Sequence, residues 1–480
     1  MERGLSDTIV YPFRNHAYPS ILLSLVFGVG VLFSLAGMMN GYGLKLMVAF
    51  GLLYFLIQRF FTQNFTIVVF VALLYQWMQV TIKVFDGFFN DVPFESLTKY
   101  PEYFHEAYYV GIFALWSFAY GIAWQLKKFQ YSTVVFEQEL LELKPLPMLL
   151  GYLGFGVLIN ALFALRFVVP GLFQAIALLT NFKWSLFFIL FFVVHVHRKY
   201  VMVFWAIVLF EFVGSFFSFF ASFKAIIFFL LIAYMSFSII SWRKLIYVGI
   251  ASVGVYFVAI FWTSVKGEYR SFLNQGTRTQ AVRVEKDEAL DFLGDKLFQF
   301  SLEESEETQK DFVDRMSYID YLSACMNYVP SRLPHENGGI IKNSIMHILL
   351  PRILNPNKAA IDDSNHLNYY TGLDFANAQK GVSFSLGYVG DFYIDFGTYF
   401  MMIPLFFFGI FVGWILLSIF RASPSPLLGA ALITGVFDVL YKFETSQIKF
   451  LGNLIWYWIV FYFLAKYVIP RIQLFLQKQS

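Results

Sequence analysis

About twelve stretches of this 480-residue chain are apolar enough to cross a lipid bilayer. The hydrocarbon core of a bilayer is about 30 Å thick, so an apolar run of about 18 or more residues predicts a transmembrane helix. We therefore expect an all-α polytopic membrane protein with about twelve transmembrane helices. The expected spans are 20–37, 44–58, 65–84, 107–125, 147–165, 183–196, 201–220, 224–241, 245–263, 398–420, 427–440 and 450–468.

The composition agrees with this class. Hydrophobic residues make up 58% of the chain and charged residues 14%, whereas soluble globular domains are about 45–50% apolar and about 25% charged. The net charge of +3 is too small to indicate a nucleic-acid partner. The single cysteine, Cys325, excludes an intrachain disulfide. Residues 1–20 lack the apolar core and cleavage site of a signal peptide.

The positions of the basic residues predict the topology. Cytoplasmic flanks of transmembrane helices carry an excess of Lys and Arg. Alternation across the twelve spans places every basic cluster on one side, so both termini are expected in the cytoplasm. The clusters are Arg59, Lys127 with Lys128, Arg198 with Lys199, Arg243 with Lys244, Arg421, and Arg471 with Lys478.

This alternation requires that one further apolar segment, residues 167–181, does not cross the bilayer. The segment is short and contains Pro170 and Gly171. We interpret it as a re-entrant or interfacial segment, since irregular backbone at membrane depth is tolerated where protein or a cavity covers it. The alternative is a thirteenth span.

The chain then divides into three parts: a transmembrane bundle over residues 1–263, an extracytoplasmic loop domain over 264–397, and C-terminal transmembrane helices with a tail over 398–480. The loop domain begins with an acidic stretch between Glu285 and Glu307. A charge-rich, solvated surface explains that stretch without a metal site. Glu211 and Asp438 fall inside spans, where they would serve a proton path or pair with polar groups such as Lys442.

The later part of the loop domain has more specific features. Residues 316–329 have helical apolar spacing, and residues 340–350 form a second predicted helix that Pro351 ends. Arg352 and Lys358 bracket a turn that contains proline and asparagine. Asp391 and Asp395 are four residues apart and share a face if their segment is helical. They could position an acceptor sugar, or equally pair with Arg or Lys of the loop domain.

These features resemble a known family. The residues Asp314-Arg315, Pro330, Gly338, LLPRILNPNK and GDFYIDFG are similar to the outer-loop pattern of Wzy-type polymerases of oligosaccharide repeat units, also called O-antigen polymerases. The stretch ASFKAII resembles a small-residue turn with a basic residue in such enzymes, although Lys224 stands where arginine is common. The resemblance covers about the second half of the chain. The same topology resembles O-antigen ligases.

The resemblance implies a metal-independent, GT-C-type glycosyltransferase in the bacterial cytoplasmic membrane, without a cofactor. Such an enzyme moves a growing glycan from undecaprenyl diphosphate onto a new lipid-linked repeat unit at the outer face. A chain-length regulator and a flippase are the expected protein partners. A ligase, a lipid-linked oligosaccharide transporter and a non-catalytic scaffold are the alternatives. Transport is disfavoured because the sequence shows no repeated halves and its charge is concentrated in one outer loop.

The chemistry of this transfer suggests the site residues. A lipid diphosphate leaves as an anion, and arginine binds phosphate oxygens bidentately while keeping its charge. We expect Arg352 and Arg315 to stabilise that anion, His335 to act as a general base, and Asp391 to assist. Binding of the diphosphate and the acceptor is expected from a larger set: Lys224, Arg270, Lys266, Lys358, Arg332, Asp395 and Arg166.

Overall fold

Every regular element that the structure describes is a helix, which confirms the all-α class. The structure, a computed structural model, describes residues 20–61, 64–127, 129, 131–165, 173–217, 223–237, 242–276, 282–300, 305–350, 361–375 and 383–471. The helices are α1 (Ser20–Gly37), α2 (Gly43–Phe60), α3 (Ile67–Asn90), α4 (Phe104–Leu126), α5 (Thr133–Glu142), α6 (Pro145–Leu165), α7 (Phe173–His197), α8 (Val201–Gly214), α9 (Phe223–Phe237), α10 (Trp242–Leu273), α11 (Lys286–Gln299), α12 (Ser305–Met316), α13 (Ile319–Tyr328), α14 (Gly339–Leu349), α15 (Asp363–Thr371), α16 (Tyr388–Phe400), α17 (Met402–Ala422), α18 (Pro426–Gly435), α19 (Phe437–Leu440) and α20 (Gln447–Phe463).

Eight helices in the described part of the chain are long and apolar enough to cross a membrane. They are α1, α2, α3, α4, the 178–197 part of α7, α10, α17, and α20 with the turns that follow it. Helices α5 and α6 meet at 85° and would add a ninth as one broken span. Helices α8 (with the turn that follows it), α9 and α18 are apolar but shorter. The structure thus supports a polytopic membrane protein, with fewer long helices than the twelve spans expected.

The structure describes the second part of the segment 167–181. Residues 173–181 are the first turns of α7, which continues without a break to His197; residues 167–172 lie outside the described residues. The positions of the helix breakers agree with this helix. Pro170 and Gly171 precede the helix, and the sequence from Phe173 to His197 contains neither proline nor glycine.

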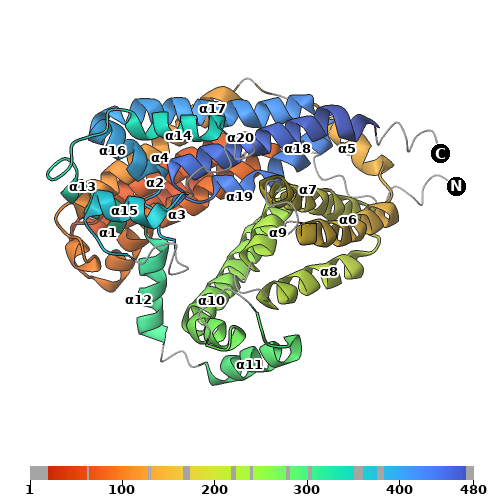
Figure 1. Cartoon of the computed structure of the whole chain (residues 1–480), viewed down its shortest axis with the longest axis horizontal. Coiled ribbons are helices and arrows are strands. Elements are labelled where there is room, and N and C mark those ends of the chain that lie inside the picture. The colour runs from red at the N-terminus through yellow and green to blue at the C-terminus, as the bar shows by residue number, and fades with distance from the viewer. Residues whose placement is uncertain are drawn as a thin grey trace.

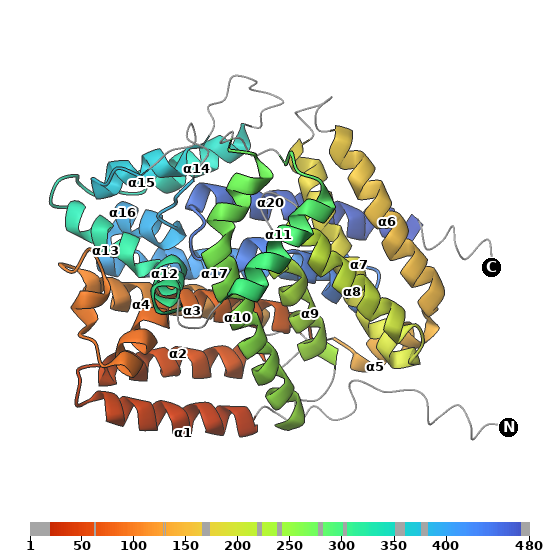
Figure 2. The same ribbon diagram turned by 90° about the horizontal axis from the view of Figure 1, so that it is seen from below.

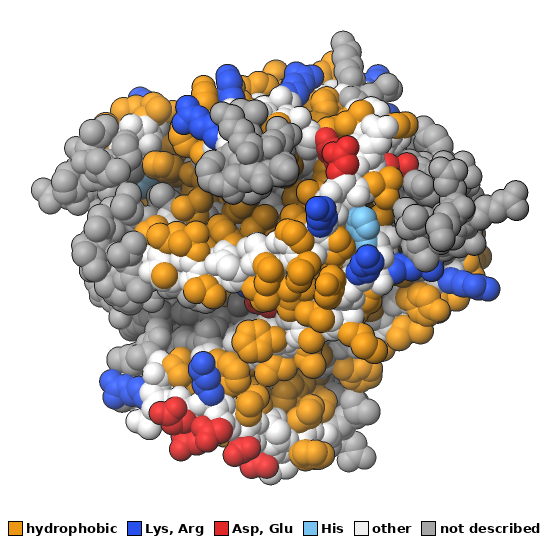
Figure 3. Space-filling model, turned by 90° about the vertical axis from the view of Figure 1, so that its right-hand side faces the viewer, with side chains coloured by type: hydrophobic (Ala, Val, Ile, Leu, Met, Phe, Trp, Pro, Cys, Tyr) orange, Lys and Arg blue, Asp and Glu red, His pale blue; other side chains and the backbone are white. Residues whose placement is uncertain are grey.

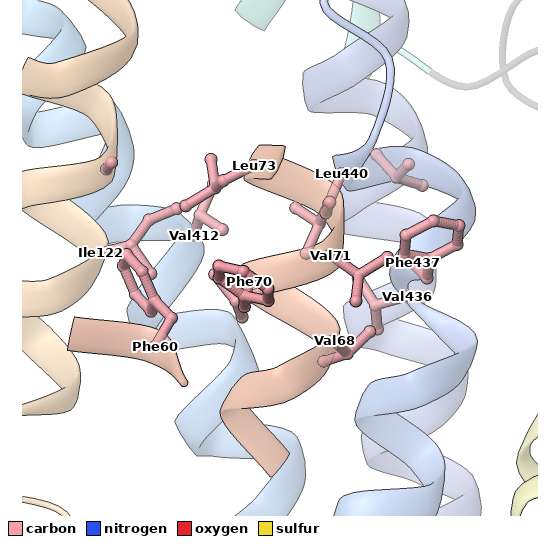
Figure 4. Close-up of a cluster of buried hydrophobic side chains, with 14 of the residues drawn as sticks. Phe60, Val68, Phe70, Val71, Leu73, Ile122, Val412, Val436, Phe437 and Leu440 are labelled. Atoms are coloured by element: carbon pink, nitrogen blue, oxygen red, sulfur yellow. The ribbon is translucent and has the colours of Figure 1, made fainter. Parts of the chain in front are cut away.

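Close helix packing holds the body together. Helices α4 and α17 approach so closely that a Cβ atom added to Gly121 would lie 2.1 Å from the carbonyl oxygen of Phe406, and one on Gly409 would lie 2.1 Å from that of Phe118. Small residues allow such contact between backbones in membranes. Figure 4 shows the adjoining core, where Phe70 of α3 lies among side chains from α2, α4 and α17.

Many apolar side chains also face outward. Phe210 on α8 is 77% exposed and Val157 on α6 is 72% exposed, and hydrophobic side chains cover much of the face in Figure 3. Large exposed apolar surfaces mark contact with a membrane or a partner. Acidic side chains gather at the lower end of Figure 3, the end where Figure 1 places α11, whose Asp287, Glu288 and Asp291 are exposed. The acidic stretch is a solvated surface there, as expected.

The loop domain is continuous with the bundle. Helix α10 runs from the predicted last span of the N-terminal bundle through to Leu273, so it crosses the expected boundary at residue 263. Helices α10, α11 and α12 project below the long helices of the body in Figure 1, and α12 packs against both α10 and α3. Helix α13 packs on α4, and α14 packs on α16 and α20 (Figure 2). Helix α12 thus joins α10 to α3.

Candidate functional site

Helix α3 carries a row of polar side chains into the core. The Gln76 and Gln79 side chains are 0% and 2% exposed. Gln76 Nε2 donates to the carbonyl oxygen of Leu440 at 2.6 Å, and its Oε1 accepts from the Tyr388 hydroxyl at 2.8 Å. Buried polar groups are costly unless paired. The pairing fixes the chain between α19 and α20, residues 441–446, against α3.

Gln79 holds one carboxylate in this connecting segment. Its Nε2 donates to Glu444 Oε2 at 2.7 Å, and its Oε1 accepts from the backbone N–H of Phe443 at 3.0 Å. The Gln79 carbonyl oxygen also accepts from the backbone N–H of Tyr318 at 3.3 Å, which ties the loop domain to the same turn of α3. The buried Gln79 amide therefore fixes both the Glu444 carboxylate and the backbone of the preceding residue.

Three tyrosines surround the Glu444 carboxylate. Tyr75, Tyr318 and Tyr441 all lie within its electrostatic range, and the rings of Tyr75 and Tyr441 meet edge to face at 5.3 Å. Burial, reinforced by Glu444, raises the pKa of Tyr318 well above its usual value. Tyr318 therefore stays a neutral phenol, able to donate a hydrogen bond.

Five cations from α9, α10, α12 and the connecting segment lie in electrostatic range of one another in steps, and one of them, Lys224, is in range of Glu444. Lys266 on α10 lies within electrostatic range of Lys224, Arg270 and Arg315. Lys224 in turn lies within range of Lys442 and of Glu444. We call Lys224, Lys266, Arg270, Arg315 and Lys442 the cationic cluster.

Packing of α9, α10 and α12 builds the cationic cluster. The rings of Phe223 and Trp262 meet at 5.8 Å between α9 and α10, one residue before Lys224. Tyr256 and Phe312 meet at 5.8 Å between α10 and α12. At the far end of α12, the Tyr75 hydroxyl lies 3.5 Å from Met316 Sδ, directly after Arg315. Aromatic contacts thus bring cations distant in sequence to one place.

Two acids besides Glu444 lie near members of the cationic cluster in the described part of the chain. Asp311 lies in range of Lys266, and Asp438 forms an ion pair with Lys442 at 3.4 Å, as expected for an acid inside a span. Like charges repel, so such a cluster is stabilised by water or a bound anion. The Lys224 side chain is exposed. The arrangement can bind a multivalent anion beside a fixed carboxylate.

The paired aspartates have a different place from the one expected. They share α16, as predicted, but both are 1% exposed. Asp391 accepts from His366 Nε2 at 2.8 Å and from the backbone N–H of Gln447 at 2.7 Å. Asp395 accepts from the N–H groups of Ile340 and Ile341 at 2.8 and 2.9 Å. Both carboxylates thus accept hydrogen bonds from groups inside the protein. Asp395 caps α14, and Asp391 fixes the start of α20. They position helices, and neither pairs with Arg or Lys in the described residues.

His366 and Asp363 extend this polar network from α15. Burial lowers the pKa of His366 and the Asp391 carboxylate raises it, with a net upward shift. Asp363 pairs with Lys449 at 2.7 Å and accepts from the Ser446 hydroxyl at 3.0 Å. The connecting segment before α20 is therefore held from the loop domain as well as from α3.

Other predicted site residues lie elsewhere. His335 Nδ1 contacts the carbonyl oxygen of Ile394 at 3.2 Å, and its ring meets Tyr393, so the proposed general base packs on α16. Arg332 is exposed after α13. Arg166, Arg352 and Lys358 lie outside the described residues. Of the predicted binding and catalytic cations, the structure brings together Lys224, Lys266, Arg270 and Arg315.

The sequence interpretation missed Gln76, Gln79 and Glu444. The signal for the glutamines was present, since three-residue spacing places both on one face of an apolar span. Glu444 carries no such signal, because it lies just beyond the predicted span 427–440. Only the tertiary contact with Gln79 marks it.

The fold and the site define a helical, membrane-type protein with a cluster of cations and a carboxylate that a buried amide fixes. A family model described as a domain of unknown function (DUF8712) matches residues 103–477, which is more than half of the chain. The chain belongs to that family. The match includes the whole cationic cluster and Glu444, whereas α3 precedes it. No curated protein and no solved structure matches the chain.

Proposed function

We propose that the protein is a membrane glycosyltransferase that polymerises undecaprenyl-diphosphate-linked oligosaccharide repeat units into surface polysaccharide. The observation that carries this proposal is that Lys266 lies in range of Lys224, Arg270 and Arg315, and that Lys224 is in range of Glu444. Stabilisation of the charge that develops on a leaving group often contributes more to catalysis than any other effect. A lipid diphosphate carries such charge at the membrane surface, where this cluster would receive it.

The residues have distinct roles in the proposed transfer. The guanidinium groups of Arg270 and Arg315 suit the phosphate oxygens, and Lys224 and Lys266 add point charges. Arg352, predicted from its sequence pattern, would be a further ligand of the diphosphate. The three neutral tyrosines around Glu444 offer hydroxyl groups and ring faces to sugars.

The proposal includes a topology and an architecture. Nine long or broken spans, with α8, α9 and α18 as shorter ones, would give the twelve crossings that the basic clusters require. Both termini would then be cytoplasmic, and the cationic cluster would lie at the outer face of the bacterial cytoplasmic membrane. The architecture would be of the GT-C type.

Deletion of the gene tests the function in cells. The polymerase is expected to be required for chain growth, so the deletion strain should display single repeat units on gel analysis of its surface glycan. Full-length glycan that is not attached to its acceptor would support a ligase instead, and an intact glycan pattern would contradict both.

Paired variants test the cationic cluster. Removal of one key charge-stabilising donor costs about 10²–10³ in rate, so Arg315→Ala should shorten or abolish the polymer in the complemented deletion strain. Lys342→Ala removes an exposed cation of the same loop domain outside the cluster and should leave the polymer unchanged. Equal effects of the two variants at equal protein level would contradict the assignment.

A further inference from the structure

Glu444 is held as a fixed side chain at the boundary between the loop domain and the bundle. The Gln79 amide occupies Oε2 of the carboxylate and also holds the backbone of Phe443. An ionised carboxylate has about four lone-pair sites, so Glu444 can accept a further hydrogen bond while Gln79 keeps it in place. A general base needs this combination of a fixed position and free acceptor capacity.

The other carboxylates near the site are less suitable. Asp438 forms an ion pair with Lys442, and Asp311 is an exposed residue on α12. Asp391 and Asp395 are buried and bound to internal donors. Among the described residues in range of the cationic cluster, Glu444 alone is fixed by a buried amide and surrounded by tyrosines.

The surroundings of Glu444 suit the binding of an acceptor sugar. Lys224 lies in range of Glu444, Lys442 and Lys266, so the carboxylate is near the cations that would bind a diphosphate. The rings of Tyr75 and Tyr441 pack beside it, and aromatic faces bind sugars through their apolar C–H surfaces. A sugar placed between the tyrosines and the cations would bring its hydroxyl within reach of Glu444.

We infer that Glu444 is the general base of the transfer, an inference that rests on the proposed function. The acceptor hydroxyl oxygen forms a bond to the anomeric carbon of the donor sugar. The bond between that carbon and the lipid-diphosphate oxygen breaks, and its electron pair leaves with the diphosphate. The hydroxyl proton moves to the Glu444 carboxylate.

The test uses the full-length protein in proteoliposomes with lipid-linked oligosaccharide extracted from the deletion strain. Glu444→Gln keeps the size of the side chain and can still accept the Gln79 hydrogen bond, but it cannot take a proton. Elongation should fall by about 10²–10⁴-fold, while the lipid-linked oligosaccharide that is retained by the immobilised, detergent-solubilised protein stays at the wild-type level. Glu102→Gln is the matched control, because Glu102 is an exposed carboxylate that accepts a hydrogen bond from Asn327 at 3.3 Å; it should elongate normally.

A second variant keeps the inference open to refutation if Glu444→Gln fails to fold. Glu444→Ala with added formate should regain elongation, because formate supplies a carboxylate in the vacated space. Wild-type rates in Glu444→Gln, or no formate rescue in a folded Glu444→Ala, would overturn the role of Glu444 while the wild-type protein still elongates. A wild-type protein that cannot elongate would overturn the proposed function itself.

Discussion

Replacement of Lys83 by methionine is expected to detach the loop domain from the bundle. The Lys83 ammonium lies 2.8 Å from Asp320 Oδ1, 2.9 Å from Asp314 Oδ1 and 2.6 Å from the carbonyl oxygen of Leu97, and the side chain is 4% exposed. Asp314 and Asp320 flank Arg315 and the start of α13. Lys83 therefore fixes the end of α12 that carries part of the cationic cluster.

The magnitude follows from the burial of each partner. Asp314 is 41% exposed, so its pair with Lys83 is worth about 1 kcal/mol or less. Asp320 is 14% exposed, and removal of one partner of a buried pair costs about 3–5 kcal/mol. The Thr98 hydroxyl still donates to Asp320 at 2.6 Å in the variant, which favours the lower end, about 3 kcal/mol.

The assay is unfolding of the detergent-solubilised protein, followed by tryptophan fluorescence. Lys83→Met should lose about 3 kcal/mol, and Lys83→Met with Asp320→Asn should regain most of it, because no unpaired charge stays buried. The exposed Lys99 supplies the control, and Lys99→Met should unfold like wild type. A Lys83→Met protein within about 1 kcal/mol of wild type would refute the reasoning.

Three further predictions concern packing, pH and topology. Gly409→Ala should destabilise the protein by about 1–3 kcal/mol in the same unfolding assay, because the added Cβ would lie 2.1 Å from a backbone oxygen. Gly151→Ala is the control and should be neutral, since the space around Gly151 is open. Equal effects of the two variants would contradict the close contact between α4 and α17. Folding raises the pKa of His366 above its ordinary value of 6.5. The protonated His366 therefore stabilises the fold fully below pH 6.5, and this contribution is lost as the pH rises through the pKa of the folded protein. The unfolding midpoint should fall over that pH range, and His366→Gln should remove this component. Asn337→Cys should react in intact cells with a membrane-impermeant maleimide, since position 337 is exposed while Cys325 is 0% exposed and burial raises its thiol pKa; reaction only after the inner face is opened would reverse the topology.

The sequence predicted the helical class and several spans well, because long apolar runs have one stable form in a bilayer. It predicted short apolar elements less well. The expected span 427–440 divides into α18 and α19 at Val436, directly after Gly435. The end of α19 is fixed by a side chain distant in sequence, since Gln76 of α3 binds the backbone of Leu440, and local hydropathy carries no sign of that contact.

The candidate site was also predicted only in part from the sequence. Charge beside apolar runs is visible in the sequence, and the predicted cation Lys266 does lie within range of Lys224, Arg270 and Arg315. The roles of the carboxylates depend on tertiary contacts. Asp395 was expected near substrate and instead caps α14, while Glu444 lies in the site because Gln79 holds it there.

Reconstitution of the purified protein tests the central claim most directly. Proteoliposomes that contain only this protein and lipid-linked oligosaccharide from the deletion strain should form a ladder of lipid-linked glycans longer than one repeat unit. Arg315→Ala proteoliposomes should form at least about 10²-fold less of it. If the wild-type protein leaves every oligosaccharide at one repeat, or moves the lipid across the bilayer without lengthening its glycan, the account of this protein as a polymerase is wrong.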